Sequence, residues 1–228
     1  MTGESQTRPE RLALPERTEA SRLVVVARAP HADAYAPVLD ALVAAGIRSI
    51  ELTLTTPATI ELLPELVARY DGLADLGVGT VTDVDEVDAA AAAGARYLVT
   101  PVSDPAVVAR ALSVGVPIVP GGLTPTELHG SWRAGASAVK VFPAGQVTPG
   151  YVADLRGPFP GIRVVPSGGV DLEGARAWLR AGAVAVSVGG PLLGDAFRGG
   201  DLDALRERAA AFVAVCAPQA PASPGVER

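Results

Sequence analysis

Residue types that supply reactive or metal-binding groups are scarce in this chain of 228 residues. It has one cysteine, Cys216, which excludes an internal disulfide. His31 and His129 are its only histidines, so a cluster of histidine and cysteine ligands is excluded and we expect no metal site. It has one lysine, Lys140, whereas arginine supplies every other permanently charged basic side chain.

Long apolar runs and basic clusters are also missing. No apolar run approaches the roughly 20 residues that a membrane-spanning helix needs, so we expect no membrane association. The net charge is −6 and no group of basic residues stands out, which argues against nucleic acid as a partner. The segment 1–19 is polar and lacks the apolar centre of a secretory signal. We therefore expect a cytoplasmic protein.

What the chain does contain is a regular alternation of short apolar runs and longer stretches with helical spacing. Apolar residues make up 49% of it, which is enough for a sizeable core. The runs rich in Val and Ile predict strands at Leu23–Arg28, Ser49–Leu54, Asp75–Gly79, Tyr97–Thr100, Pro117–Pro120, Ala138–Phe142, Arg163–Pro166 and Ala185–Val188. Helices are predicted at Asp33–Ala45, Thr59–Tyr70, Asp83–Ala93, Pro105–Val114, Pro125–Ala134, Gly150–Leu155, Leu172–Ala181 and Leu202–Val215.

Start and stop signals support several of these helices. Residues whose side-chain oxygens can cap a helix stand at four starts, namely Asp83, Asp104, Thr124 and Asp171. An Ala-Gly pair follows four helices, with its glycine at Gly46, Gly94, Gly135 and Gly182. The chain therefore reads as repeated strand–helix units.

About eight such units favour the α/β class and a single (β/α)8 TIM barrel, with an open doubly wound sheet as the other option. The strands are apolar throughout, as a sheet covered on both faces requires. We expect residues 1–21 to form an amino-terminal arm or short helix, residues 22–216 to form the barrel, and residues 217–228 to form a flexible tail.

Lys140 is the strongest candidate for a reactive residue. It lies in the apolar run Ala138–Phe142, where alternation places it on the same face as Phe142. If that face points into the barrel, partial desolvation favours the neutral amine, which can attack a ketone and form an imine. A lysine that extends to water or pairs with a carboxylate is the alternative.

Glu51 is the second unusual residue, because it lies in the apolar run Ser49–Leu54. It shares a face with Thr53 and Thr55, opposite the large aliphatic side chains of the run. A carboxylate on the inner face of a barrel needs a partner. Both an ion pair with Lys140 and a proton shuttle beside it fit the pattern.

Three glycine-containing loops follow predicted strands. They are Gly77–Thr80, Pro166–Gly169 and Val188–Pro191. Glycine allows backbone N–H groups to approach an anion, and the loops after strands seven and eight hold a phosphate in many barrels. Tight turns would use the same glycines, so one such loop alone is weak evidence for a phosphate site. The presence of both later loops is stronger evidence than either loop alone.

These motifs, in this order, resemble the family of 2-keto-3-deoxy-6-phosphogluconate (KDPG) aldolases and 4-hydroxy-2-oxoglutarate (KHG) aldolases. The resemblance covers about residues 23–193. The run Lys-x-Phe-Pro-Ala at Lys140–Ala144, together with Glu-x-Thr-Leu at Glu51–Leu54, is its most specific part.

The resemblance implies a (β/α)8 fold, a homotrimer and neither metal nor cofactor. It implies that Lys140 forms the Schiff base and that Glu51 moves protons. It further implies that Thr80, Pro101 and Phe142 line a pyruvate pocket. The phosphate or distal end of the substrate would lie against Ser167, Gly168, Gly169, Gly189 and Gly190.

The chain departs from the family pattern at two positions. Members of the family have an arginine after Glu-x-Thr-Leu that binds the substrate carboxylate, whereas this chain has Thr55. A hydroxyl cannot replace a bidentate guanidinium, and Arg28 at the end of the first strand is the candidate replacement. Pro191 stands where the family often has a serine, and it offers neither a hydroxyl nor an N–H for phosphate.

The sequence thus predicts a class I aldolase that reversibly cleaves a 4-hydroxy-2-oxo acid, with or without a phosphate, to pyruvate and an aldehyde. A sugar-phosphate isomerase, epimerase or synthase on the same barrel is the first alternative, since the glycine loops suit it equally well. A non-catalytic barrel that binds a small keto acid is the second.

Overall fold

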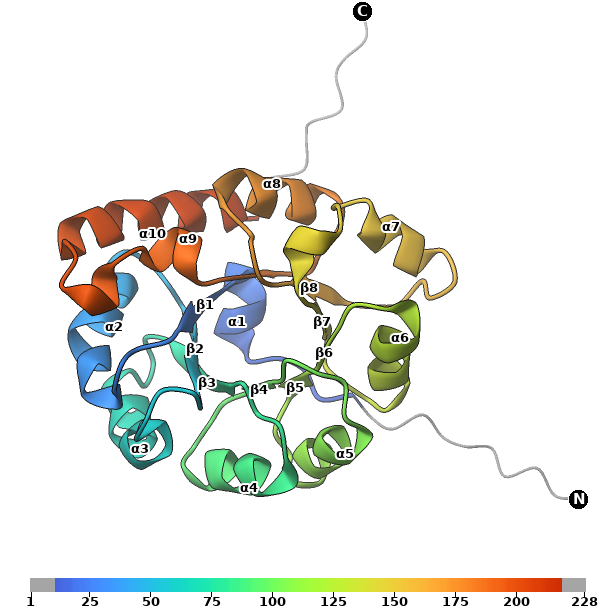
Figure 1. Cartoon of the computed structure of the whole chain (residues 1–228), viewed down its shortest axis with the longest axis horizontal. Coiled ribbons are helices and arrows are strands. Elements are labelled where there is room, and N and C mark those ends of the chain that lie inside the picture. Colours follow the sequence, from blue (N-terminus) through green and yellow to red (C-terminus); the bar gives the residue numbers. More distant parts are fainter. Residues whose placement is uncertain (1–10, 219–228) are drawn as a thin grey trace, which may run out of the picture.

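The computed structural model describes residues 11–218, and its short buried strands run parallel to one another. The strands are β1 Leu23–Ala27, β2 Ser49–Thr53, β3 Asp75–Gly79, β4 Leu98–Val99, β5 Ile118–Val119, β6 Gly121–Gly122, β7 Val139–Val141, β8 Val164–Pro166 and β9 Val186–Val188. They curl around a common centre, and Figure 1 shows the larger helices outside them. The first ten residues of the expected arm and the last ten of the expected tail lie outside the described residues.

Helices follow most strands, as the sequence predicts. They are α1 Glu16–Ser21, α2 Tyr35–Ala44, α3 Thr59–Arg69, α4 Val84–Ala92, α5 Pro105–Ser113, α6 Pro125–Arg133, α7 Tyr151–Arg156, α8 Leu172–Arg180, α9 Gly190–Leu193 and α10 Leu202–Cys216. Short 3-10 turns are η1 Ala32–Ala34, η2 Ala144–Gln146 and η3 Ala196–Arg198. Each of the four expected capping side chains accepts a hydrogen bond from a backbone N–H of its helix. Each glycine of the four Ala-Gly pairs has a positive φ.

The strands form two hydrogen-bonded sheets, in the orders β5-β4-β3-β2-β1-β9 and β6-β7-β8. The predicted strand Pro117–Pro120 is present as β5, and a further short strand that was not predicted, β6, follows Pro120 and belongs to the other sheet. A proline nitrogen cannot donate a ladder hydrogen bond, although its carbonyl oxygen accepts one from the Lys140 N–H at 2.8 Å. A single bridge between Ser167 and Ser187 links the ends of β8 and β9.

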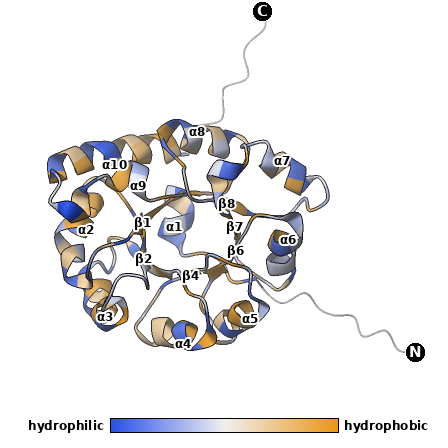
Figure 2. Ribbon diagram, viewed as in Figure 1, coloured by the Kyte–Doolittle hydropathy of each residue, from blue (hydrophilic) through white to orange (hydrophobic). Residues whose placement is uncertain are grey.

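Hydrophobic side chains pack in two layers. The larger layer lies between the strands and the outer helices, and Figure 2 shows hydrophobic strands at the centre with helices of mixed character around them. A smaller inner cluster fills the space that the strands enclose, and it consists of Leu14, Val24, Tyr97, Val99, Val119, Ala138, Val165 and Ala185. Buried polar side chains, among them Glu51 and Lys140, share the inner space with this cluster.

Helix α1 covers the amino ends of the strands. Its Thr18 contacts Ser49 and Asp75, which are the first residues of β2 and β3. The expected short helix at the amino terminus is thus present from Glu16 to Ser21, and it closes one end of the inner space. Within residues 11–218 no helix has the length and apolar character that crossing a membrane requires.

Candidate active site

Lys140 and Glu51 lie on the inner face of the strands, on β7 and β2 respectively. Lys140 is 6% exposed and Glu51 is 1% exposed, so the structure buries both groups as the alternation in their strands predicts. They line the same small cavity of about 20 Å³, together with Tyr97, Ser187 and apolar side chains. A cavity of this size holds about one water molecule.

The Lys140 amine has an aromatic neighbour and no close anion. Its Nζ lies 5.1 Å from the centre of the ring of Phe142, the residue that directly follows β7. Among the described residues no carboxylate lies within 4.0 Å of it, so the direct ion pair with Glu51 does not form. The amine and the carboxylate instead line one cavity without forming a direct contact.

The Glu51 carboxylate occupies a space that a glycine leaves open. A Cβ atom added to Gly79 on β3 would lie 1.9 Å from Glu51 Oε1. The other carboxylate oxygen, Oε2, is buried and has no hydrogen-bond partner among the described residues. A buried carboxylate oxygen without a partner is costly in free energy, which is typical of groups that act on a ligand.

The residues expected to line the pyruvate pocket follow strands β3, β4 and β7, directly or after one residue. Thr80 follows β3 directly and has a φ of 64°, a backbone conformation that is strained for a residue with a side chain and that concentrates at functional sites. Phe142 is 37% exposed although it is a large hydrophobic residue. Pro101 comes two residues after the end of β4. Its backbone packs closely against Gly121, because a Cβ atom added to Gly121 would lie 2.6 Å from the Pro101 carbonyl group.

The residues expected at the distal end of the substrate come together at the ends of β8 and β9. The hydroxyl groups of Ser167 and Ser187 are 3.1 Å apart. Gly168 and Gly169 both have a positive φ, and the Phe142 ring packs against Gly168. Gly189 is the N-cap residue of α9, Gly190 is its first residue and Pro191 its second.

Thr55 and Arg28 follow β2 and β1, which are neighbours in the sheet. Both side chains are exposed. The two loops are joined by Thr56, whose hydroxyl accepts from the Ala29 N–H at 3.0 Å and lies 3.1 Å from the Ala29 carbonyl oxygen. The Arg28 guanidinium forms no ion pair or hydrogen bond with other residues in the range 11–218, so it is available to an anion.

Two inward-facing residues were missed by the sequence reasoning. Ser187 interrupts the apolar run Val186–Val188, and that interruption is the signal that could have found it. Tyr97 stands before β4, and nothing in its local sequence indicates that it lies beside Glu51. Within the described part of the chain, no group of three or more His, Cys, Asp or Glu side chains could hold a metal ion.

A curled parallel sheet that buries one lysine and one carboxylate beside the same cavity defines an α/β enzyme with a candidate imine-forming centre. Comparisons with known proteins identify the family of this enzyme. Residues 14–207 match the family described as KDPG and KHG aldolase. The chain belongs to this family, and it is accordingly a class I pyruvate aldolase and an aldehyde-lyase.

Individual relatives agree with this assignment. The 2-dehydro-3-deoxy-6-phosphogalactonate aldolase of Escherichia coli is 33% identical over 193 residues, which are 84% of this chain and 92% of that protein. The 2-dehydro-3-deoxy-phosphogluconate aldolase of Dickeya dadantii is 34% identical over 84% of this chain and 89% of its own length. The family assignment selects the aldolase over the isomerase, epimerase or synthase that the glycine loops also suit.

Solved structures show the same fold. The native KDPGal structure has a TM-score of 0.78 and 30% identity, and the match covers 94% of this chain and 97% of that one. The KDPG aldolase from Legionella pneumophila, with pyruvate captured at low pH as a covalent carbinolamine intermediate, has a TM-score of 0.79 and 25% identity. That match covers 86% of this chain and 96% of that one.

Proposed function

We propose that Lys140 is the nucleophile of this aldolase and that Glu51 is its acid and base. The observation that carries the proposal is the shared cavity, into which the only lysine of the chain and a carboxylate with an unpartnered oxygen both face.

The reaction proceeds through an imine. The neutral Lys140 amine adds to the C2 ketone of a 4-hydroxy-2-oxo acid, and loss of water from the resulting carbinolamine gives a protonated imine. Glu51, directly or through one water, takes the proton of the C4 hydroxyl group as the C3–C4 bond breaks. The electron pair of that bond passes to the imine nitrogen, the aldehyde leaves, and the enamine takes a proton at C3. Hydrolysis then releases pyruvate and the free amine.

The substrate we propose is a 2-keto-3-deoxy sugar acid phosphate, as the names of the relatives indicate, or the shorter 4-hydroxy-2-oxoglutarate. Thr80, Pro101 and Phe142 line the pyruvate part of the site, and Arg28 with Thr55 binds its carboxylate. Support for Arg28 comes from its unpaired guanidinium, which can contact both oxygens of a carboxylate.

The distal end of the substrate lies against Ser167, Gly168, Gly169, Gly189 and Gly190 in this proposal. Their support is the positive φ of the first glycine pair and the buried serine hydroxyl beside it. Because Pro191 has no N–H, it contributes no hydrogen bond to a phosphate.

For the whole molecule we propose a closed (β/α)8 barrel over residues 22–216 that assembles as a homotrimer. The supports for closure are the bridge between Ser167 and Ser187, which links β8 to β9, and the continuity of β5 with β6 through Pro120. The trimer rests on the family resemblance alone and the cytoplasmic location on sequence composition, and light scattering of the purified protein tests the trimer.

Trapping with borohydride tests the role of Lys140. Incubation with pyruvate and reduction should add the mass of pyruvic acid less one oxygen atom, and peptide mapping should place it on Lys140. Lys140→Arg should abolish both the adduct and turnover, because a guanidinium stays charged at every working pH.

The α-amino terminus is the other amine that could react, so the peptide map is essential. Arg133→Lys on α6 supplies a matched control, since it adds a solvent-accessible lysine away from the cavity. An adduct on that added lysine at a level comparable to Lys140, or undiminished turnover of Lys140→Arg, would refute the proposal.

A further inference from the structure

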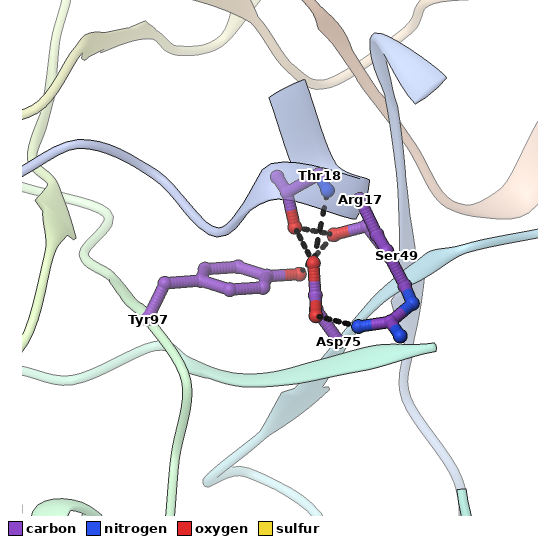
Figure 3. Close-up of polar contacts among 5 residues, drawn as sticks. All are labelled: Arg17, Thr18, Ser49, Asp75 and Tyr97. Carbon is purple, nitrogen blue, oxygen red and sulfur yellow. Dashed lines mark hydrogen bonds and ion pairs between the residues drawn. The ribbon is translucent and has the colours of Figure 1, made fainter. Parts of the chain in front are cut away.

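A buried polar network lies beneath the two reactive groups, at the end of the strands that α1 covers. Its members, drawn in Figure 3, are Arg17, Thr18, Ser49, Asp75 and Tyr97. We call it the floor network. The Thr18 backbone N–H donates to Asp75 at 2.9 Å, and its hydroxyl lies 3.0 Å from the same carboxylate oxygen and 2.8 Å from the Ser49 hydroxyl.

Tyr97 is the member of the floor network that reaches toward the reactive groups. Its hydroxyl is 2.9 Å from the Ser49 hydroxyl, and the residue is 1% exposed. Its ring lies over Gly77, where an added Cβ would be 2.4 Å from the ring. The tyrosine is thus anchored at its hydroxyl end, and its ring fills a space that exists only because residue 77 has no side chain.

Glu51, on β2, fills the neighbouring space over strand β3. Gly77 and Gly79 are two residues apart on β3 and therefore face the same side. Tyr97 lies over the first glycine and the Glu51 carboxylate lies over the second. Because side chains two residues apart on one strand face are roughly 7 Å apart, the ring and the carboxylate occupy adjoining positions. Both residues also line the cavity that Lys140 faces.

The ring and the carboxylate also interact electrostatically. Burial raises the pKa of the Tyr97 phenol well above its ordinary value; the hydrogen bond to Ser49 opposes this rise, and the charges of Glu51 and Asp75 add to it. The phenol therefore stays protonated, and Tyr97 does not itself exchange protons with the substrate at neutral pH.

We infer that Tyr97 is a positioning residue for the acid–base group. It forms an aromatic surface beside the Glu51 carboxylate that limits the directions in which the carboxylate can turn and fixes it toward the substrate. This inference rests on the proposed role of Glu51. The floor network holds the ring in place, so α1 contributes to proton transfer without touching the substrate.

The test isolates proton transfer from imine formation. Exchange of the pyruvate methyl protons with deuterated water, followed by NMR, requires both the imine and the base, whereas borohydride trapping requires only the imine. Tyr97→Leu should trap pyruvate on Lys140 within about 2-fold of the native level, and its exchange rate should fall about 10- to 100-fold. Tyr97→Phe keeps the ring, so it should stay within about 5-fold of native exchange.

Tyr35→Leu is the matched control, because Tyr35 is also fully buried but lies on α2, in the outer layer. It should lose stability and keep native exchange. If Tyr97→Leu does not fold, Tyr97→Met replaces it and should show the same loss of exchange. Exchange by folded Tyr97→Leu or Tyr97→Met at the native rate would overturn the inference. A native protein without an adduct on Lys140 would refute the proposed function itself.

Discussion

The position of the buried Glu51 carboxylate depends on the glycine at position 79. A side chain at position 79 on β3 would overlap with the Glu51 carboxylate from β2. Because residue 79 is glycine, the carboxylate occupies that space. Because Gly79 has no positive φ, alanine is compatible with its backbone. The three atoms nearest to a Cβ at this position all belong to the Glu51 side chain.

Gly79→Ala should therefore fold and lose activity. The added Cβ would lie 1.9 Å from Oε1 and 2.4 Å from Cδ of Glu51, so the flexible side chain must turn away from its present position. A displacement of about 1 Å in a catalytic group costs roughly 100-fold in rate. We expect kcat to fall by about that factor while pyruvate is still trapped on Lys140.

Gly130→Ala is the control for this substitution, because Gly130 lies within α6 and an added Cβ there meets nothing within 4 Å. It should keep native activity and raise the unfolding free energy by about 0.5–1 kcal/mol, as alanine suits a helix better than glycine. Native turnover by Gly79→Ala would show that the position of the Glu51 carboxylate does not limit the reaction.

At the scale of elements, helix starts and ends were predictable because local chemistry determines them. Asp83, for example, accepts a hydrogen bond from the Glu86 N–H at 2.9 Å, as its place before an Ala-rich stretch indicates. Alternation in the short strands gave which residues share a face with Lys140 and Glu51, and the structure shows that both side chains are buried. The short strand β6 at Gly121–Gly122 was not predicted, because two glycines after a proline carry no apolar pattern that indicates a strand.

The contact of α1 with the strands could not be predicted either. Thr18 and Asp75 are 57 residues apart, and no local pattern states which strand end a short helix will cover. The same holds for Tyr97 and Glu51, whose proximity depends on two glycines of a third segment. Sequence patterns thus gave Lys140 and Glu51 as candidates, while the groups packed around them required the structure.

The attachment of α1 is open to a direct test. Thr18→Val keeps the shape and the backbone N–H of Thr18 but leaves Ser49 and Asp75 without its hydroxyl. A buried polar group that loses a partner costs about 1–3 kcal/mol, so urea unfolding should show a loss of stability in that range. Thr126→Val, on the exposed side of α6, should stay within about 0.5 kcal/mol of the native value. Equal stability of the two variants would contradict a structural role for the floor network.

For the molecule as a whole, the last helix, α10, packs against helices from both the first and the last part of the described chain. It packs against α2 and α8, and Arg208 on it donates to the Leu192 carbonyl oxygen of α9 at 2.8 Å. Its last residue, Cys216, is fully buried and is the only thiol of the chain. The reactivity of that thiol therefore reports whether α10 remains in place.

Cys216 should resist labelling by Ellman's reagent in the native protein. Burial raises the pKa of the thiol to about 11, against a smaller opposing effect of the Arg22 charge. About one part in a thousand would be thiolate at pH 8, and the thiolate is the reactive form. Unfolding in urea should expose the thiol and restore fast labelling. Fast labelling of the native protein at pH 8 would show that α10 opens freely.

The same pKa fixes the sign of a pH effect on stability. The folded state holds the Cys216 proton more tightly than the unfolded state, whose thiol titrates near pH 8.5. The stabilisation is therefore fully present below that pH and is lost as pH rises through about 11. Cys216→Ala should flatten the decline in unfolding free energy between about pH 8.5 and 10, measured by urea titration at each pH. An identical decline in both proteins would assign the alkaline loss of stability to other groups.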